Sequence, residues 1–209
     1  MSARDDLDDQ SIGDFLGKLA ARMAAPGAGA TAAIEAALSA SLVAMVGRFT
    51  TDEEHADLVG GIVAAADEQR DACLEAAAAD EAAFSAVARA MKLPRGTEEE
   101  KAARRRRLSE ASLDATRPPL AVLAAAGELV ALAGRVLPVA NRNLVSDVAA
   151  ATAAARAAAT TARLSVEANL PAIDDEAAQA DLDSALAGVE DLARRADAVE
   201  ADVRRRLRR

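Results

Sequence analysis

Asn143, Ser146 and Asp147 are polar residues set into an alanine-rich stretch, in the segment NRNLVSD. Positions three and four residues apart share one face of a helix, so the three side chains can form a single polar patch. A carboxylate among apolar residues is costly to bury unless a partner satisfies it. The patch is therefore either satisfied within the protein or directed at a polar ligand. An N-cap role for Asn141 or Asn143 is the structural alternative, although it does not account for the carboxylate one turn inside the helix.

Gly27 and Gly29 lie in the segment PGAGA, directly before an apolar stretch that predicts a helix. Small residues at this place let backbone N–H groups approach a ligand closely, and the positive end of the helix dipole favours a polar or anionic group. A plain turn between two helices is the alternative. The two glycines are therefore candidates for contact with a ligand through the backbone.

Asp80 lies in the segment ADEAAF and shares a helix face with Phe84, four residues further on. The adjacent Glu81 points to another side of the same helix, so at most one of the two carboxylates faces the interior. Asp80 is therefore the candidate for a carboxylate beside a large apolar group. Exposure of both carboxylates on the surface is the alternative.

Asn169 ends the helical stretch that contains Asp147, 22 residues further along the chain. A straight helix of that length separates the two positions by about 33 Å, which is longer than a small ligand. The two side chains therefore cannot share one ligand within a protomer unless the helix bends. A site that spans a two-fold interface removes the difficulty, as does a purely capping role for Asn169.

The composition predicts how these residues are positioned. The 209 residues are 52% hydrophobic but only 1% aromatic, so the core must be built from Ala, Leu and Val. Alanine has the highest helix propensity, and small side chains let helices approach closely. Alanine faces bury little area each, so long helices or a subunit interface must supply the rest. We predict an all-α, up-and-down bundle of about six to seven helices, two or three of them long, that forms a two-fold dimer.

Proline, glycine and capping residues divide the chain into these helices. Ser11 with Asp14, Thr51 with Glu54, and Thr97 with Glu100 have the spacing of capping boxes. We expect a disordered acidic leader over 1–10 and a single helical domain over 11–209. The predicted helices cover about residues 11–23, 31–48, 51–92, 97–117, 120–137 and 141–170, followed by a charged outer helix after Asp174.

Several classes of function are disfavoured. The formal net charge of −9 argues against nucleic acid as the main partner. Two arginine runs, 104–107 and 204–209, are most simply solvated helix ends, with a nucleic-acid or membrane contact as the alternative. Cys73 and His55 are the only residues of their types, which argues against an intrachain disulfide and ordinary Cys/His zinc chemistry. No metal is predicted.

The expected compartment is the cytoplasm. The acidic N-terminus does not have the pattern of a secretory signal. Glu35 and Glu128 interrupt the apolar runs around Leu42 and Leu123, so neither run reaches the uninterrupted length of a membrane span. No membrane contact is therefore expected.

These segments, in this order, resemble the cyclodeaminase/cyclohydrolase family. It comprises the cyclodeaminase half of formiminotransferase-cyclodeaminase and the stand-alone bacterial methenyltetrahydrofolate cyclohydrolases. SIGDFLGKLA resembles its opening helix, APGAGATAA its Pro-Gly-Gly-Gly-Ser segment, ADEAAF and MKLP its middle, and NRNLVSD its Asn-x-x-x-x-Ser-Asp signature. The chain departs from the pattern at Ala28, Ala30, Met91 and Ser165, where the family has Gly, Ser, an aromatic residue and Asn.

The resemblance implies an all-helical domain that dimerises and binds folate in a cleft near the subunit contact. Its substrates carry a cationic or easily protonated one-carbon unit between N5 and N10 of tetrahydrofolate. In the hydrolase reaction water attacks the methenyl carbon, whereas in the deaminase reaction N10 attacks the formimino carbon and ammonia leaves. Either needs a carboxylate that stabilises the cation and relays a proton, so Asp147 and Asp80 are the implied catalytic residues. Asp147 is the first candidate for this role, and Asp80 is either the other proton relay or the carboxylate that binds the 2-amino and N3 edge of the pterin.

The same resemblance implies a substrate-binding set and no tightly bound cofactor. Asn143 and Ser146 would orient water or the pterin amide, and the backbone at Gly27 and Gly29 would pack against the ligand. Lys92, or an arginine of 104–107, would meet the glutamate tail of folate. The substrate-binding residues are therefore Gly27, Gly29, Lys92, Asn143, Ser146 and Asn169.

Two other classes of function stay open. A divergent helical scaffold or folate-binding paralogue without turnover would account for Ala28, Ala30 and Ser165. A coiled-coil-like partner protein would account for the charged C-terminal helix, but it leaves NRNLVSD unexplained. Hydrolase and deaminase are not separated by the sequence, because the same groups serve either reaction.

Overall fold

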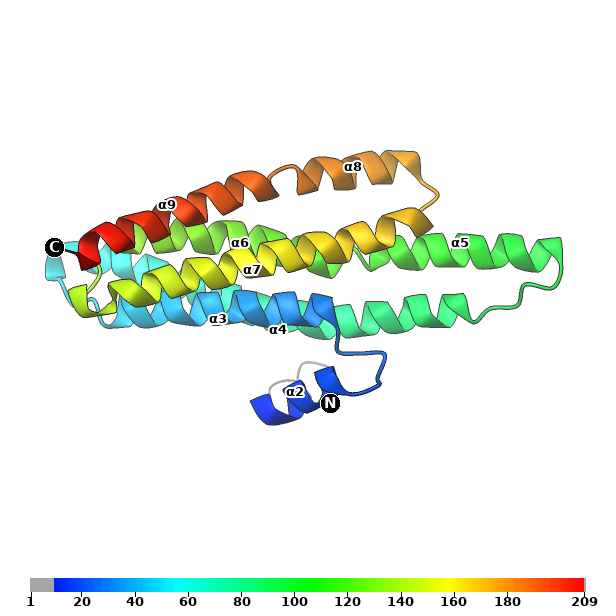
Figure 1. The fold of residues 1–209 in the computed structure, drawn as a ribbon, viewed down its shortest axis with the longest axis horizontal. Coiled ribbons are helices and arrows are strands. Elements are labelled where there is room, and N and C mark those ends of the chain that lie inside the picture. Colours follow the sequence, from blue (N-terminus) through cyan, green and yellow to red (C-terminus); the bar gives the residue numbers. More distant parts are fainter. Residues whose placement is uncertain (1–9, 209) are drawn as a thin grey trace.

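The computed structural model describes residues 10–208, and this part of the chain contains helices and no strand (Figure 1). The predicted all-α fold is therefore confirmed. The helices are α2 (Ile12–Ala20), α3 (Ala28–Arg48), α4 (Ala56–Met91), α5 (Glu98–Asp114), α6 (Arg117–Val136), α7 (Val145–Asn169), α8 (Glu176–Leu186) and α9 (Val189–Leu207), with 3₁₀ turns at Glu53–His55, Arg142–Leu144 and Leu170–Ala172.

Helices α3, α4, α6 and α7 lie side by side and form the core of the bundle, with α9 packed on α6 and α7 (Figure 1). Helix α5 packs against the second half of α4 and extends the bundle at one end. The core is largely alanine, for example Ala33, Ala36 and Ala40 of α3, which are fully buried. Small side chains let the four helices approach closely, as the composition predicts.

Local sequence signals place several helix ends. The capping boxes of Ser11 with Asp14 and of Thr97 with Glu100 are confirmed. The predicted box at Thr51 is wrong, because Asp52 accepts the Glu54 N–H and opens a 3₁₀ turn instead. A carboxylate two residues away closes this shorter turn, so the hydroxyl of Thr51 is not needed.

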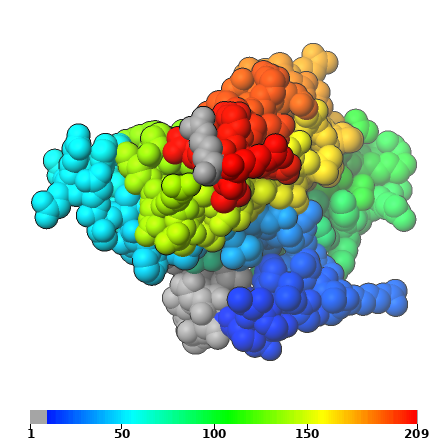
Figure 2. Space-filling model, turned by 60° about the vertical axis from the view of Figure 1, so that its left-hand side comes forward, coloured from blue at the N-terminus to red at the C-terminus, as the bar shows by residue number. Residues whose placement is uncertain are grey.

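Two predicted elements differ from the structure. Helix α3 begins at Ala28 with Gly27 as its N-cap, so Gly29 and Ala30 belong to its first turn and not to a turn between helices. The final charged helix is two helices, α8 and α9, which separate at Ala187 and Gly188. Figure 2 shows both on the outside of the bundle, as predicted for a charged helix. Residues 1–9 of the predicted leader lie outside the described residues.

Helix α2 lies apart from the main bundle, beside the start of α3 (Figures 1 and 2). Its Phe15 is buried, whereas Ile12 and Leu16 are exposed. An isolated short helix gains most of its stability from packing its apolar face. The exposed apolar side of α2 is therefore a surface that another element can cover.

Two stretches reach the length and hydropathy of a membrane span, Ala28–Arg48 and Glu98–Val136. Of their most apolar windows, 61% and 50% respectively is buried inside the bundle. The core helix of a soluble protein meets the same criterion, so these stretches are weak evidence for a membrane. The absence of a membrane contact stays a prediction.

Candidate functional site

A cavity of about 380 Å³ lies at the N-terminal end of α3, between α4 and α7. Helix α4 forms one wall with residues that are three or four positions apart, and α7 forms the opposite wall. The segment before α3 and the first turn of α3 close one side. The lining residues are Ala25, Gly27, Ala28, Gly29, Asp80, Phe84, Val87, Met91, Ala115, Thr161, Leu164, Ser165, Ala168 and Asn169.

The carboxylate of Asp80 lies directly against the first turn of α3. A Cβ atom at position 29 would lie 1.9 Å from Asp80 Oδ1, so only glycine leaves room for this approach. The N-cap residue Gly27 offers no side-chain acceptor, and Asp80 accepts a hydrogen bond from the backbone of Ala30. A carboxylate at this end of a helix is stabilised by the free N–H groups and the helix dipole.

Burial dominates the electrostatics of Asp80. Desolvation raises the pKa of this carboxyl, the Ala30 hydrogen bond opposes the rise, and the charge of Glu81 adds to it. The net effect is a pKa above the ordinary 3.8. A half-buried carboxyl with a raised pKa can accept and return a proton, which is the property expected of a general acid–base group.

The α7 wall carries three polar residues at intervals of four, Thr161, Ser165 and Asn169, on one helix face. Ser165 Oγ donates to the Thr161 carbonyl at 3.1 Å, and Asn169 Nδ2 donates to the Ser165 carbonyl at 2.9 Å. Thr161 Oγ1 donates to Glu35 Oε2 of α3 at 3.3 Å. Burial also raises the pKa of Glu35, while the Thr161 hydrogen bond lowers it.

The remaining lining is apolar. Phe84 and Met91 of α4 and Leu164 of α7 are 46%, 56% and 58% exposed, respectively, although they line the cavity. Exposed large apolar residues that gather at a concave site are typical of a ligand-binding or protein-binding surface. The cavity thus combines an apolar rim with a half-buried carboxylate and a polar wall.

Four of the predicted site residues, Gly27, Gly29, Asp80 and Asn169, meet at this one cavity. The predicted surface alternative for Asp80 is thus not what the structure shows, since the side chain is half-buried. Lys92 is exposed and directly follows α4, next to Met91 of the rim, and it does not line the cavity.

Asn143, Ser146 and Asp147 lie at the other end of α7. From Asp147 to Thr161 the helix runs 14 residues, which is about 21 Å. Asn143 lines a separate cavity of about 440 Å³ with Arg142 and Arg206, and Asp147 is half-buried and lines neither cavity. One chain therefore does not bring Asp147 and Asp80 together.

The start of the NRNLVSD segment has a structural role. Asn141 Oδ1 accepts the Asn143 N–H at 3.0 Å, and Asn141 Nδ2 donates to the Phe49 carbonyl at 3.3 Å. The Asn141 N–H donates to Thr50 Oγ1 at 3.2 Å. Asn141 is thus an N-cap, as the capping alternative predicts, but of the 3₁₀ turn Arg142–Leu144 before α7, and it ties this turn to the end of α3. It does not engage the Asp147 carboxylate.

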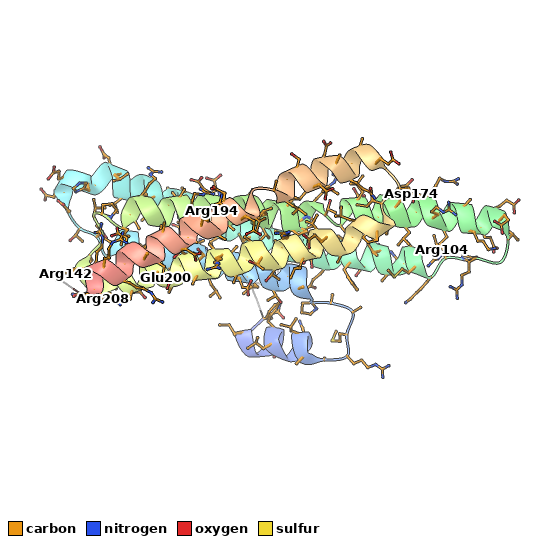
Figure 3. All side chains as sticks on the ribbon, turned by 45° about the horizontal axis from the view of Figure 1, so that its top comes forward. Arg104, Arg142, Asp174, Arg194, Glu200 and Arg208 are labelled. Atoms are coloured by element: carbon orange, nitrogen blue, oxygen red, sulfur yellow. The ribbon has the colours of Figure 1, made fainter. Side chains whose placement is uncertain are left out.

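Charged residues lie at both ends of the bundle, and one of them reaches the rim of the cavity, since Arg104 Nε donates to the Met91 carbonyl at 3.2 Å. Arg142 and Arg208 are at one end of the bundle, whereas Arg104 of α5 lies toward the other (Figure 3). Asp52, Glu54 and His55 form a group with ligand atoms within 4.8 Å of one another, between α3 and α4. This group is largely exposed, and His55 Nδ1 is already 2.9 Å from Asp52 Oδ2. Exposed acidic groups of this kind are common without a metal.

Sequence reasoning missed the pair of Glu35 and Thr161. Glu35 entered only as an interruption of an apolar run, and Ser165 only as a departure from a family pattern. The available signal was the interval of four between Thr161, Ser165 and Asn169, which puts all three on one face of the helix. No sequence signal connects Glu35 to Thr161, because the two residues are 126 positions apart.

The fold and the cavity define an all-helical bundle with a candidate ligand site built around one carboxylate at a helix N-terminus. The family model of formiminotransferase-cyclodeaminase matches residues 11–188. The chain therefore belongs to the formiminotransferase-cyclodeaminase family.

Two relatives support this assignment. A methenyltetrahydrofolate cyclohydrolase of Methylorubrum extorquens is 41% identical over 98 residues, and the match spans about half of each protein, 47% of either chain. The crystal structure of formiminotetrahydrofolate cyclodeaminase from Thermotoga maritima superposes with a TM-score of 0.81 at 25% identity. That superposition covers 97% of this chain and 98% of the other.

Proposed function

We propose that this protein is a folate-dependent one-carbon enzyme, a methenyltetrahydrofolate cyclohydrolase or a formiminotetrahydrofolate cyclodeaminase. The observation that carries the proposal is the half-buried Asp80, held against Gly29 inside a cavity with an apolar rim. The printed names of the two relatives support the same substrate class. A tetrahydrofolate derivative is the substrate, and no tightly bound cofactor takes part in this proposal.

In the hydrolase reaction, Asp80 acts as the proton relay. Water attacks the cationic methenyl carbon and loses a proton to the carboxylate, which gives a neutral tetrahedral adduct. The bond between that carbon and N5 then breaks, and Asp80 returns the proton to N5. The adduct hydroxyl loses its proton to solvent, so 10-formyltetrahydrofolate and one proton result. The negative charge of Asp80 also stabilises the cation before attack.

In the deaminase reaction the same carboxylate relays a proton from N10 to the leaving nitrogen. N10 attacks the protonated formimino carbon and loses its own proton to Asp80, so the neutral tetrahedral adduct carries the former imine nitrogen as an amine. The protonated Asp80 donates to this amine, which leaves as ammonia, and the methenyl cation forms beside the ionised carboxylate. The raised pKa of Asp80 suits both directions, because it keeps the protonated form accessible.

The proposed active assembly is a homodimer in which each chain completes the site of the other. Asp147 and Ser165 share one face of α7, and between them this face carries exposed or half-buried small residues, including Ala150, Ala154 and Ala157. Two such faces can pack antiparallel about a two-fold axis midway between those positions, at the level of residues 155–157. The partner's Asp147 would then lie opposite Ser165, at the Asp80 cavity. This arrangement gives Asp147 the catalytic role that the family resemblance implies.

The direct test is consumption of 5,10-methenyltetrahydrofolate, followed by its near-ultraviolet absorbance. The wild-type protein should exceed the buffer rate, and Asp80→Asn should lower the rate by about 100-fold or more, as expected for loss of a proton relay. Glu81→Gln is the matched control, because Glu81 neighbours Asp80 but does not line the cavity. Equal rates for wild type and buffer, with ammonia release from formiminotetrahydrofolate also absent, would remove the proposal.

A second candidate is a folate-binding relative without turnover. Ala30 donates its backbone N–H toward Asp80 but has no hydroxyl, and Ala28 lines the cavity. Loss of polar groups at the first turn of α3 is what such a relative would show. It predicts that calorimetry detects binding of a tetrahydrofolate while both turnover assays stay at the buffer rate.

A further inference from the structure

The hydroxyl of Thr161 behaves differently from those of the other threonines in α7. Thr152 donates to the Ala149 carbonyl at 2.9 Å and Thr160 to the Arg156 carbonyl at 3.0 Å, both within their own helix. Such bonds to a preceding carbonyl are the usual arrangement for a threonine inside a helix. Thr161 instead donates to Glu35 Oε2 on α3. The Thr161 hydrogen is thus directed to a carboxylate outside the helix.

The neighbours of Thr161 on the cavity wall also donate hydrogen bonds within α7. The Ser165 hydroxyl donates to the Thr161 carbonyl, and an Asn169 amide hydrogen goes to the Ser165 carbonyl. A hydroxyl has one hydrogen and two lone pairs, so Thr161 and Ser165 keep only acceptor capacity toward a ligand. Between Thr161 and Ser165 the α7 wall therefore presents hydrogen-bond acceptors, whereas Asn169 at its end keeps a second amide hydrogen as a donor.

The opposite side of the cavity has the complementary character. Ala28 and Gly29 line it from the first turn of α3, where backbone N–H groups have no partner within the helix. A ligand that fits both sides has a carbonyl oxygen next to N–H or NH₂ groups. The amino-pyrimidinone ring of a pterin has this pattern along one edge.

The geometry points to the α7 wall as the subsite for the 2-amino and N3–H edge of the pterin, with Glu35 as a positioning residue that orients Thr161 as an acceptor. This inference rests on the proposed folate substrate and adds which end of it enters the cavity. Asp80 then stays available for the one-carbon unit. Glu35 does not line the cavity and acts through Thr161 alone.

Binding calorimetry tests the inference independently of turnover. The probes are 5-formyltetrahydrofolate and its analogue with a methyl group in place of the 2-amino group. Wild-type protein should bind the amino compound about tenfold or more tightly, because the analogue leaves acceptors of the wall unpaired. Thr161→Val should abolish this preference, and Thr160→Val is the matched control that should keep it. Glu35→Gln should weaken the preference, since a glutamine amide can donate to Thr161 and turn the hydroxyl hydrogen toward the ligand.

Each result decides between the claims. Equal binding of the two probes by wild type, an unchanged preference in Thr161→Val, or no binding of either probe overturns the subsite. Turnover without a preference for the amino compound would overturn the subsite and leave the proposed activity standing. A preference for the amino compound without turnover would support the subsite and overturn the proposed activity. Circular dichroism establishes that each variant is folded, and Ser165→Ala supplies a second wall variant with the same expected loss if Thr161→Val does not fold.

Discussion

Gly29 of α3 and Asp80 of α4 approach so closely that no side chain fits between them, since a Cβ at position 29 would lie 1.9 Å from the Asp80 carboxylate. The first turn of α3 and the second half of α4 therefore meet at this contact. This contact holds the carboxylate at the helix N-terminus and at the cavity wall. Its consequences can be measured separately as stability, acid–base behaviour and activity.

Gly29→Ala should displace the Asp80 carboxylate and lower turnover by about 100-fold, since a small misplacement of a catalytic group is costly. Overpacking at a buried contact should also reduce the free energy of unfolding by about 1–3 kcal/mol. Urea unfolding and the absorbance assay measure the two effects. Gly60→Ala is the control, because a Cβ there meets nothing within 4 Å and α4 should gain about 0.5–1 kcal/mol. Unchanged activity in Gly29→Ala would contradict the close contact.

Asp80→Asn should change stability in a pH-dependent manner. The folded-state pKa of Asp80 is raised, so its ionised form is penalised in the folded protein at pH values above that pKa. The penalty disappears as the pH falls through the folded pKa and below the ordinary value of 3.8. Relative to wild type, the variant should thus be most stable at neutral pH and lose this advantage on acidification. Urea unfolding of the wild type and the variant, at neutral pH and below pH 3.8, measures the difference in the free energy of unfolding. A stabilisation of the variant that grew toward acid would refute the burial argument.

The proposed site shared between two chains predicts complementation between two inactive variants. If Asp80 of one chain works with the partner's Asp147, Asp80→Asn and Asp147→Asn are each inactive as homodimers. Co-expression should yield mixed dimers that contain one intact site and one doubly altered site. With random pairing, about a quarter of wild-type activity should return. If the mixture were as inactive as its components, Asp80 of one chain and Asp147 of the partner would not form one site. Sedimentation of each variant would establish that it still dimerises.

Cys73 should be chemically inert in the native protein. Its side chain is buried in α4, and desolvation raises the thiol pKa to about 11. Because the thiolate is the reactive form, a disulfide reagent at mildly alkaline pH should label denatured protein about a hundredfold faster than native protein. Labelling at equal rates in both states would show that the core around α4 opens freely. No activity change is expected on treatment with the reagent, since Cys73 does not line the cavity.

Local interactions could be predicted wherever they join residues a few positions apart. Thr97 and Glu100 form their capping box as the spacing indicates, and Asp80 and Phe84 share a face and line the same cavity. Errors arose where two local solutions compete, as at Asp52, or where a helix could begin at several small residues, as at Ala28. Helix propensity differs little among such neighbours, so the choice depends on packing.

By itself, the sequence determined the helical class, most of the breaks between helices and the identity of several cavity residues, because helix periodicity and capping act over three or four residues. Only the tertiary structure decided that Gly29, Asp80 and Asn169 converge, that Glu35 pairs with Thr161, and that Asp147 lies away from them in one chain. These relations join residues tens of positions apart. They depend on which helices pack against each other, and because the helices have similar alanine faces, a local sequence pattern does not predict this packing.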